Sequence, residues 1–133
     1  MPKLQNKNKT VLLTKRFSFD AAHKLTQHKG KCKNLHGHTY FLEVTICGTV
    51  DHKTGMVMDF GDMKEIVENS VLKKLDHHYI NDVIKISTAE NIISWVWGEL
   101  LEKFKEHNVD LYELKLWENP SSFVTCQLQK YEN

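Results

Sequence analysis

No stretch of the sequence is apolar over the ~18 residues that a membrane-spanning helix requires. The first ten residues are polar and rich in lysine, and they lack the apolar core of a secretory signal. Proline is scarce, with only Pro2 and Pro120 in 133 residues, so no proline-rich hinge divides the chain. A transmembrane, collagenous or long disordered protein is therefore excluded, and the length suits one domain.

Cysteine is also scarce, and neither sign of charge is in excess. The three cysteines, Cys32, Cys47 and Cys126, cannot form a closed disulfide framework, and without a secretory signal we expect reduced thiols. Lys and Arg number 18 against 17 Asp and Glu, whereas a dedicated nucleic-acid binder is usually more basic. We therefore expect a cytoplasmic protein that binds neither nucleic acid nor a membrane.

Four segments have the patterns of strands. Residues 10–20 alternate, with four apolar side chains on one face: Val11, Leu13, Phe17 and Phe19. Residues 36–50 alternate in the same way, with one face made of Tyr40, Leu42, Val44 and Ile46. Residues 111–118 and 123–131 are predicted to be the third and fourth strands.

Two helices are predicted between these pairs of strands. The first begins at Asp62, with Glu65 three residues on as a capping signature. Its apolar stripe consists of Met63, Ile66, Val67, Val71 and Leu75. The second begins with the capping box Ser87-x-x-Glu90 and ends near His107. The order ββααββ predicts an α+β domain over residues 10–133, an antiparallel sheet with two helices on one face, after a frayed tail at residues 1–9.

A four-stranded open sheet has two edges with unpaired backbone groups. Long exposed edges promote aggregation unless another strand pairs with them. We therefore expect other copies of the chain to close the sheet, which makes the protein a homo-oligomer.

Histidine is the one residue type in excess, with eight in the chain. His36 and His38 flank Gly37 at a strand start, so both imidazoles point to the same face. His23 lies near the end of the facing strand. Three histidines with an open fourth position are the usual plan of a catalytic zinc site, so we predict Zn²⁺ on His23, His36 and His38.

Two further groups have side chains suited to metal binding or catalysis at this site. Cys32 lies in the loop four residues before His36, either as a fourth ligand of a structural metal or as a reactive thiolate, and spacing alone leaves both open. Neighbouring lysines favour the thiolate and can attract a phosphorylated substrate. Asp76 precedes His77 after the first helix, and a carboxylate that orients an imidazole makes an acid–base pair. By itself this pair is more typical of an ordinary helix-to-loop junction with exposed polar residues.

Glu118 closes an apolar strand, where a carboxylate can hold the amidine-like edge of a heterocycle with two hydrogen bonds. Glutamates at strand ends are common, so this signal is weak when taken alone.

Together these pieces resemble the 6-pyruvoyl-tetrahydropterin synthase family. The matching stretches run in order over nearly the whole chain: Phe17–His23, Cys32–Tyr40, Gly55–Phe60, Leu75–Asn81, Thr88–Asn91 and the region of Glu118. Three residues separate Cys32 from His36, which is most similar to the 6-carboxytetrahydropterin synthase branch of queuosine precursor synthesis. Ser87 and Asn119 stand where the family often has proline and threonine. These two differences bear on the details of the substrate more than on whether the chain resembles the family.

The resemblance implies a tunnelling fold (T-fold), in which three sheets form a barrel and two trimers stack as a hexamer. It implies active sites between subunits, with Glu118 serving a zinc site of a neighbouring chain. Cys32, Asp76 and His77 would be catalytic, and substrate contacts would come from Glu118, Thr88 and Glu90.

The implied reaction is a lyase reaction on 7,8-dihydroneopterin triphosphate, a small-molecule pterin triphosphate. The products would be 6-carboxy-5,6,7,8-tetrahydropterin, acetaldehyde and triphosphate. Three alternatives remain: formation of the pyruvoyl product on the same fold, a closed non-catalytic zinc module, and a pterin-binding protein without turnover.

Overall fold

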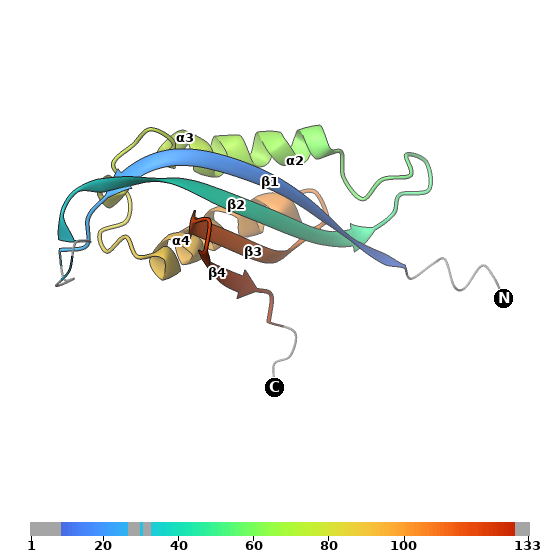
Figure 1. The fold of residues 1–133 in the computed structure, drawn as a ribbon. Coiled ribbons are helices and arrows are strands. Elements are labelled where there is room, and N and C mark those ends of the chain that lie inside the picture. The colour runs from blue at the N-terminus through green and yellow to red at the C-terminus, as the bar shows by residue number, and fades with distance from the viewer. Residues whose placement is uncertain (1–8, 27–29, 31–32, 130–133) are drawn as a thin grey trace.

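A computed structural model describes residues 9–26, 30 and 33–129 of the chain (Figure 1). Its four strands are β1 (Thr10–His23), β2 (His36–Thr49), β3 (Asp110–Asn119) and β4 (Ser122–Gln127). They form one antiparallel sheet in the order β1-β2-β3-β4. The helical segments between β2 and β3 are α2 (Phe60–Val67), the π-helical η2 (Glu68–Leu72), α3 (Lys73–Leu75), the 3₁₀ turn η3 (Ile80–Asp82) and α4 (Ala89–Lys105). The predicted ββααββ architecture is confirmed.

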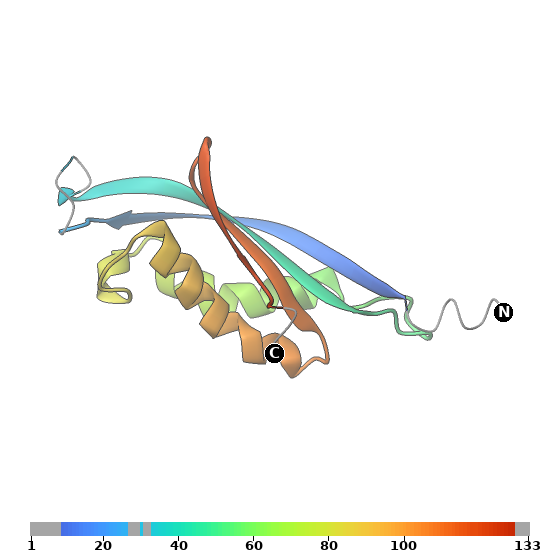
Figure 2. The ribbon, with the colours of Figure 1, turned by 90° about the horizontal axis from the view of Figure 1, so that it is seen from below.

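The helices α2 and α4 cover the same face of the sheet, and the core lies between these helices and the sheet (Figure 2). The register that pairs Phe17 with Leu42 puts the apolar residues of β1 and β2 on that face. The predicted alternation is confirmed, because Tyr40, Leu42, Val44 and Ile46 are all fully buried. From α4, the core receives Ile92, Val96, Leu100 and Phe104.

Both predicted helix starts are wrong by one to three residues. The cap of α2 is Asp59, whose carboxylate accepts from the backbone N–H of Gly61, so Asp62 lies inside the first turn. The cap of α4 is Thr88, whose hydroxyl accepts from the N–H of Asn91 at 3.1 Å. Each helix start offers two capping residues close together, and propensity alone does not choose between them.

The first helix is not regular, because the π-helical turn η2 interrupts it. The residues that it buries completely, Met63, Val67, Val71 and Leu75, recur every four positions. A regular helix has 3.6 residues per turn, so this spacing would rotate the stripe away from the sheet. The wider π turn restores the alignment, and all four side chains reach the core.

The edge of β1 is covered near its C-terminal end. The N–H of His77 donates to the carbonyl of Asp20 at 2.6 Å, and the N–H of Ala22 donates to the carbonyl of His78 at 3.2 Å. A parallel bridge joins Ala22 to Tyr79. Residues 76–79 therefore act as a short additional strand along this part of β1.

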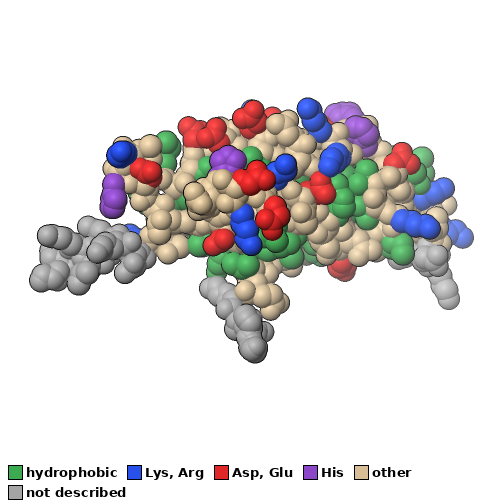
Figure 3. Space-filling model, turned by 180° about the vertical axis from the view of Figure 1, so that it is seen from behind, with side chains coloured by type: hydrophobic (Ala, Val, Ile, Leu, Met, Phe, Trp, Pro, Cys, Tyr) green, Lys and Arg blue, Asp and Glu red, His purple; other side chains and the backbone are tan. Residues whose placement is uncertain are grey.

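The surface agrees with the balanced composition. Seen from behind, basic and acidic side chains are interspersed over the molecule (Figure 3). Among the described residues, no helix combines the length and apolarity needed to cross a membrane.

Candidate active site

Three histidines converge at one end of the sheet, on the face that carries the core. The β1–β2 register places His23 opposite His36 and Ala21 opposite His38. Their ring centroids are 4.6 to 5.2 Å apart, and one ring nitrogen from each lies within 4.8 Å of the others. The predicted convergence of His23, His36 and His38 is confirmed.

Hydrogen bonds fix the tautomers of two of these histidines. The Nδ1 of His23 lies 2.8 Å from the carbonyl oxygen of Ser87, and the Nδ1 of His36 lies 2.7 Å from that of Asn34. A carbonyl oxygen only accepts, so each Nδ1 carries the proton and each Nε2 presents a lone pair. This tautomer is the one that binds a metal through Nε2.

The two Nε2 atoms face each other at 3.1 Å. With both protons on Nδ1, no hydrogen bond can form between the Nε2 atoms of His23 and His36, and two lone pairs at this distance repel. A cation bound by both removes the repulsion. Nitrogens at the usual zinc distance in a tetrahedral site lie about 3.3 Å apart, so the donor set fits a metal ion.

Burial favours the neutral form of two of the imidazoles, His23 and His38. Desolvation lowers the pKa of His23 from its usual value and outweighs the hydrogen bond to Ser87, which raises it. Burial also lowers the pKa of His38, against the negative charge of Glu118. The Nε2 of His38 is buried and has no hydrogen-bond partner in the described part of the chain. A neutral imidazole with a free Nε2 is ready to bind a metal.

Ser87 supports His23 from behind and is itself fully buried. Its carbonyl accepts from His23, its hydroxyl lies 3.1 Å from the same Nδ1, and that hydroxyl also donates to Asn81 at 3.2 Å. Sequence reasoning assigned Ser87 to a helix cap and missed this contact, because a carbonyl that accepts a hydrogen bond leaves no signal in residue type.

Glu118 lies beside the histidines of its own chain. Its Oε2 is 3.5 Å from the Nε2 of His38 and 3.6 Å from the Nε2 of His23. The expectation from the resemblance placed Glu118 at the zinc of a neighbouring chain, and the geometry of this chain differs. The strand that carries Glu118, β3, pairs with β2, which carries His36 and His38.

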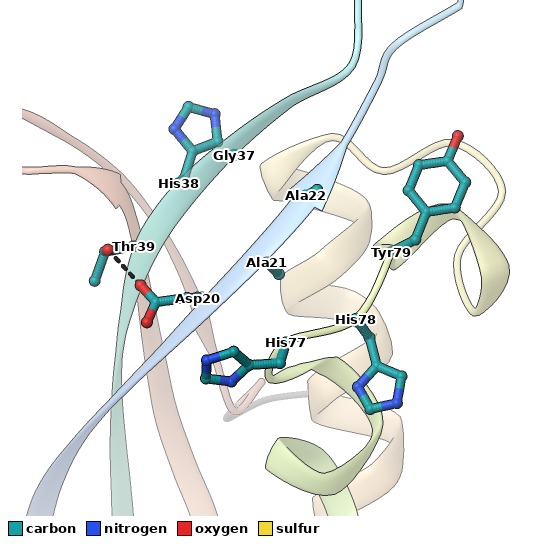
Figure 4. Close-up of a pocket in the computed structure, with 9 residues that line it drawn as sticks. All are labelled: Asp20, Ala21, Ala22, Gly37, His38, Thr39, His77, His78 and Tyr79. Atoms are coloured by element: carbon teal, nitrogen blue, oxygen red, sulfur yellow. Dashed lines mark hydrogen bonds between the residues drawn. The ribbon is translucent and has the colours of Figure 1, made fainter.

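The Asp76–His77 pair forms as predicted from the sequence, with His77 Nδ1 3.0 Å from Asp76 Oδ1. Asp76 also accepts from the backbone N–H of Asp20 at 3.0 Å, which fixes the pair to the β1 edge. The side chain of Asp20 accepts from the hydroxyl of Thr39 and lies beside His77 (Figure 4). His77 has a positive φ of 61°, an uncommon conformation for a residue other than glycine, and it occurs here in the turn anchored to β1.

The pair and the histidine cluster lie on different sides of β1. Asp20 has the opposite parity to Ala21 and His23, so its side chain points to the uncovered face of the sheet. An open cavity of about 540 Å³ at this end has both His38 and His77 in its lining. The histidine cluster and the Asp76–His77 pair of one chain are therefore two separate groups, with strand β1 between them.

Three predicted site residues remain. Cys32 lies outside the described residues. Thr88 caps α4, and Glu90 is an exposed residue of the first turn of that helix. Thr88 directly follows Ser87, so the start of α4 borders the histidine cluster.

The comparison with known proteins shows the family. A family model described as 6-pyruvoyl tetrahydropterin synthase matches residues 12–129. The chain belongs to the 6-pyruvoyl tetrahydropterin synthase family.

Relatives of both product types occur in this family. A 6-pyruvoyl tetrahydrobiopterin synthase of Dictyostelium discoideum is 38% identical over 132 residues, covering 88% of this chain and 96% of that protein. A 6-carboxy-5,6,7,8-tetrahydropterin synthase of Haemophilus influenzae is 36% identical over 144 residues, covering 89% and 98%. The structure of the Caenorhabditis elegans 6-pyruvoyl tetrahydropterin synthase is 28% identical and superposes with a TM-score of 0.81, covering 91% and 97%. These relatives support an enzyme of the tetrahydropterin synthase type.

Proposed function

We propose that the protein is a zinc-dependent 6-carboxy-5,6,7,8-tetrahydropterin synthase that acts on 7,8-dihydroneopterin triphosphate. The observation that carries the metal is the approach of the Nε2 atoms of His23 and His36 to 3.1 Å while the Nδ1 atom of each lies against a backbone carbonyl oxygen. The branch rests on the spacing of Cys32 and His36 and on relatives that carry this name. The reaction takes up water and yields the carboxypterin, acetaldehyde and triphosphate, in the formation of queuosine precursors.

Each group of the chain has a defined task in this proposal. His23, His36 and His38 hold Zn²⁺, which as a Lewis acid makes side-chain hydroxyls of the substrate more acidic. Glu118 accepts hydrogen bonds from the pterin ring beside the histidines, and Thr88 and Glu90 line the entrance from the start of α4. Cys32 as a thiolate and His77, oriented by Asp76, move protons on the substrate side chain.

The separation of the two groups by β1 bears on which chains form one site. The Asp76–His77 pair sits at the edge of the sheet, where a second copy would approach. We therefore assign a complete site to two copies, with the histidines and Glu118 from one and the Asp76–His77 pair from its neighbour. This assignment makes assembly a requirement for turnover.

Assembly gives the first prediction. The outer edges of the sheet, β1 and β4, are unpaired over much of their length in one chain, and we expect three chains to close a barrel and two such trimers to stack. Sedimentation or light scattering at micromolar concentration should show a species several times 15.6 kDa, with six chains as the expected count. A stable, active monomer would contradict both the barrel and the shared site.

The product gives the second prediction. Purified protein incubated with dihydroneopterin triphosphate should release acetaldehyde in step with triphosphate, because the short tether between Cys32 and His36 restricts where the thiolate sits over the side chain. Trapping of the volatile aldehyde and the mass of the pterin product show which of the two reactions occurs. A pterin that retains three side-chain carbons, with no acetaldehyde, assigns the protein to pyruvoyl formation instead.

A non-catalytic zinc module is the alternative from a different class. In that case Cys32 would complete a closed site, and a chelator would unfold the chain. The contacts of Glu118 and the anchored Asp76–His77 pair favour catalysis, since a closed structural site needs neither.

A further inference from the structure

Tyr40 is fully buried, and its hydroxyl has no hydrogen-bond partner among the residues that the structure describes. An unpaired hydroxyl in an apolar interior is unfavourable, and native proteins usually avoid it. Phenylalanine would fill the same space without this cost. The hydroxyl therefore indicates a role other than packing.

The ring of Tyr40 lies between the core and the histidine cluster. It stacks on Phe19 with centroids 4.9 Å apart and meets the rings of His38 and His23 edge to face at 5.5 and 6.2 Å. On the same face of the sheet, Tyr40 is the next residue of β2 after His38. It borders the proposed metal site without being one of the three ligands.

The ends of β2 and β3 bring a carboxylate to the neighbourhood of the hydroxyl. The pairing of β2 with β3 ends with Phe41 opposite Trp117, and Tyr40 and Glu118 are the next residues of the two strands. Glu118 also lies 3.5 Å from His38, whose ring Tyr40 meets edge to face. Side chains at such cross-strand positions are close neighbours. Burial raises the pKa of Tyr40, and the negative charge of Glu118 raises it further, so the phenol remains a hydrogen-bond donor.

Glu118 has two competing uses for its carboxylate. Its Oε2 already lies 3.5 Å from the Nε2 of His38, and carboxylate oxygens are themselves good zinc ligands. A glutamate that turned fully toward the metal would close the open position and leave the pterin ring without its anchor. A donor on the side of the core would hold the carboxylate away from the metal.

We propose that Tyr40 is a positioning residue: in the metal-loaded protein, the Glu118 carboxylate turns from the histidines to accept a hydrogen bond from the Tyr40 hydroxyl, which is unpaired among the described residues of this structure, and this bond keeps the carboxylate directed toward the pterin. The role of Glu118 in this proposal rests on the proposed function. The hydrogen bond itself concerns only residues of this chain and can be measured without turnover.

The test uses the metal-loaded oligomer and neopterin, which has the pterin ring and side chain without the triphosphate. Tyr40→Phe should bind neopterin about 10-fold more weakly in a fluorescence titration, the size expected for one hydrogen bond to a charged group. Metal content should stay at the wild-type value. In a Glu118→Gln background, the same substitution should have a much smaller effect, because the two residues act as a unit.

Tyr112→Phe is the matched control, since it removes a hydroxyl from the same sheet at a distance from the histidines. A second readout is the ¹³C signal of the Glu118 carboxylate, identified by its loss in Glu118→Gln. This signal should shift in Tyr40→Phe and not in Tyr112→Phe.

The outcomes separate the two proposals. If wild-type protein does not bind neopterin but the Glu118 signal shifts in Tyr40→Phe, the pterin function is wrong and the hydrogen bond stands. If the signal does not move, or if Tyr40→Phe binds as tightly as wild type, the role of Tyr40 is overturned. Loss of metal in Tyr40→Phe, or an equal loss of binding in both backgrounds, overturns it as well.

Discussion

Replacement of His36 by alanine is expected to empty the metal site and abolish turnover. The Nε2 of His36 faces that of His23 at 3.1 Å, so the substitution removes one of three ligands and leaves two that bind a metal weakly. Loss of an outer hydrogen-bond partner typically lowers metal affinity 10- to 100-fold, and loss of a direct ligand should exceed roughly 100-fold. Metal content per chain after dialysis measures the effect, with about one zinc expected in the wild type.

Two further variants make this result specific. His52→Ala removes an exposed histidine in the turn after β2 and should retain both metal and activity. Cys32→Ala should retain most of the metal and lose activity. If Cys32→Ala loses zinc as completely as His36→Ala, then Cys32 is a ligand, and its assignment as a catalytic thiolate is wrong.

Replacement of His77 by alanine is expected to lower turnover by roughly 10²- to 10⁴-fold, the usual range for loss of a positioned acid–base group. Pterin binding and metal content should remain near the wild-type values, because His77 lies on the other side of β1 from the histidine cluster. Cys32→Ala should have a similar effect, and the double variant should be little worse than either single one.

The same variants test whether two copies share a site. His77→Ala and His36→Ala should each be inactive alone, whereas oligomers co-expressed from both chains should regain part of the activity. In such oligomers some sites combine the intact histidines of one chain with the intact His77 of its neighbour. Continued inactivity of well-mixed oligomers would place the acid–base pair and the metal within one chain.

The parts of the fold set by local periodicity were predictable. Alternation placed Phe17, Phe19 and Tyr40 on the buried face, and the His36-Gly37-His38 spacing placed two imidazoles on that face as well. His23 joined them in the prediction because antiparallel pairing brings strand ends together. This alternation is visible in the sequence itself, so the buried face of these strands was predictable without the structure.

Features that depend on distant backbone atoms were not predictable. The carbonyl of Ser87 that fixes His23 comes from a position 64 residues away, and any residue type offers a carbonyl. The anchoring of Asp76 and His77 along β1 is a backbone contact in the same way. The position of Glu118 required the β2–β3 register, which a bulge between Thr45 and Ile46 shifts by one residue.

The short segment 76–79 along β1 has a consequence for growth of the sheet. The outward backbone groups of Asp20 and Ala22 are occupied, so only the part of the edge from Thr10 to Ser18 can accept a strand from another chain. The opposite edge, β4, offers six residues. An incoming β4 that slid too far along β1 would meet the turn that carries His77. The segment thus acts as a stop that fixes alignment between copies and protects the edge against open-ended fibril growth.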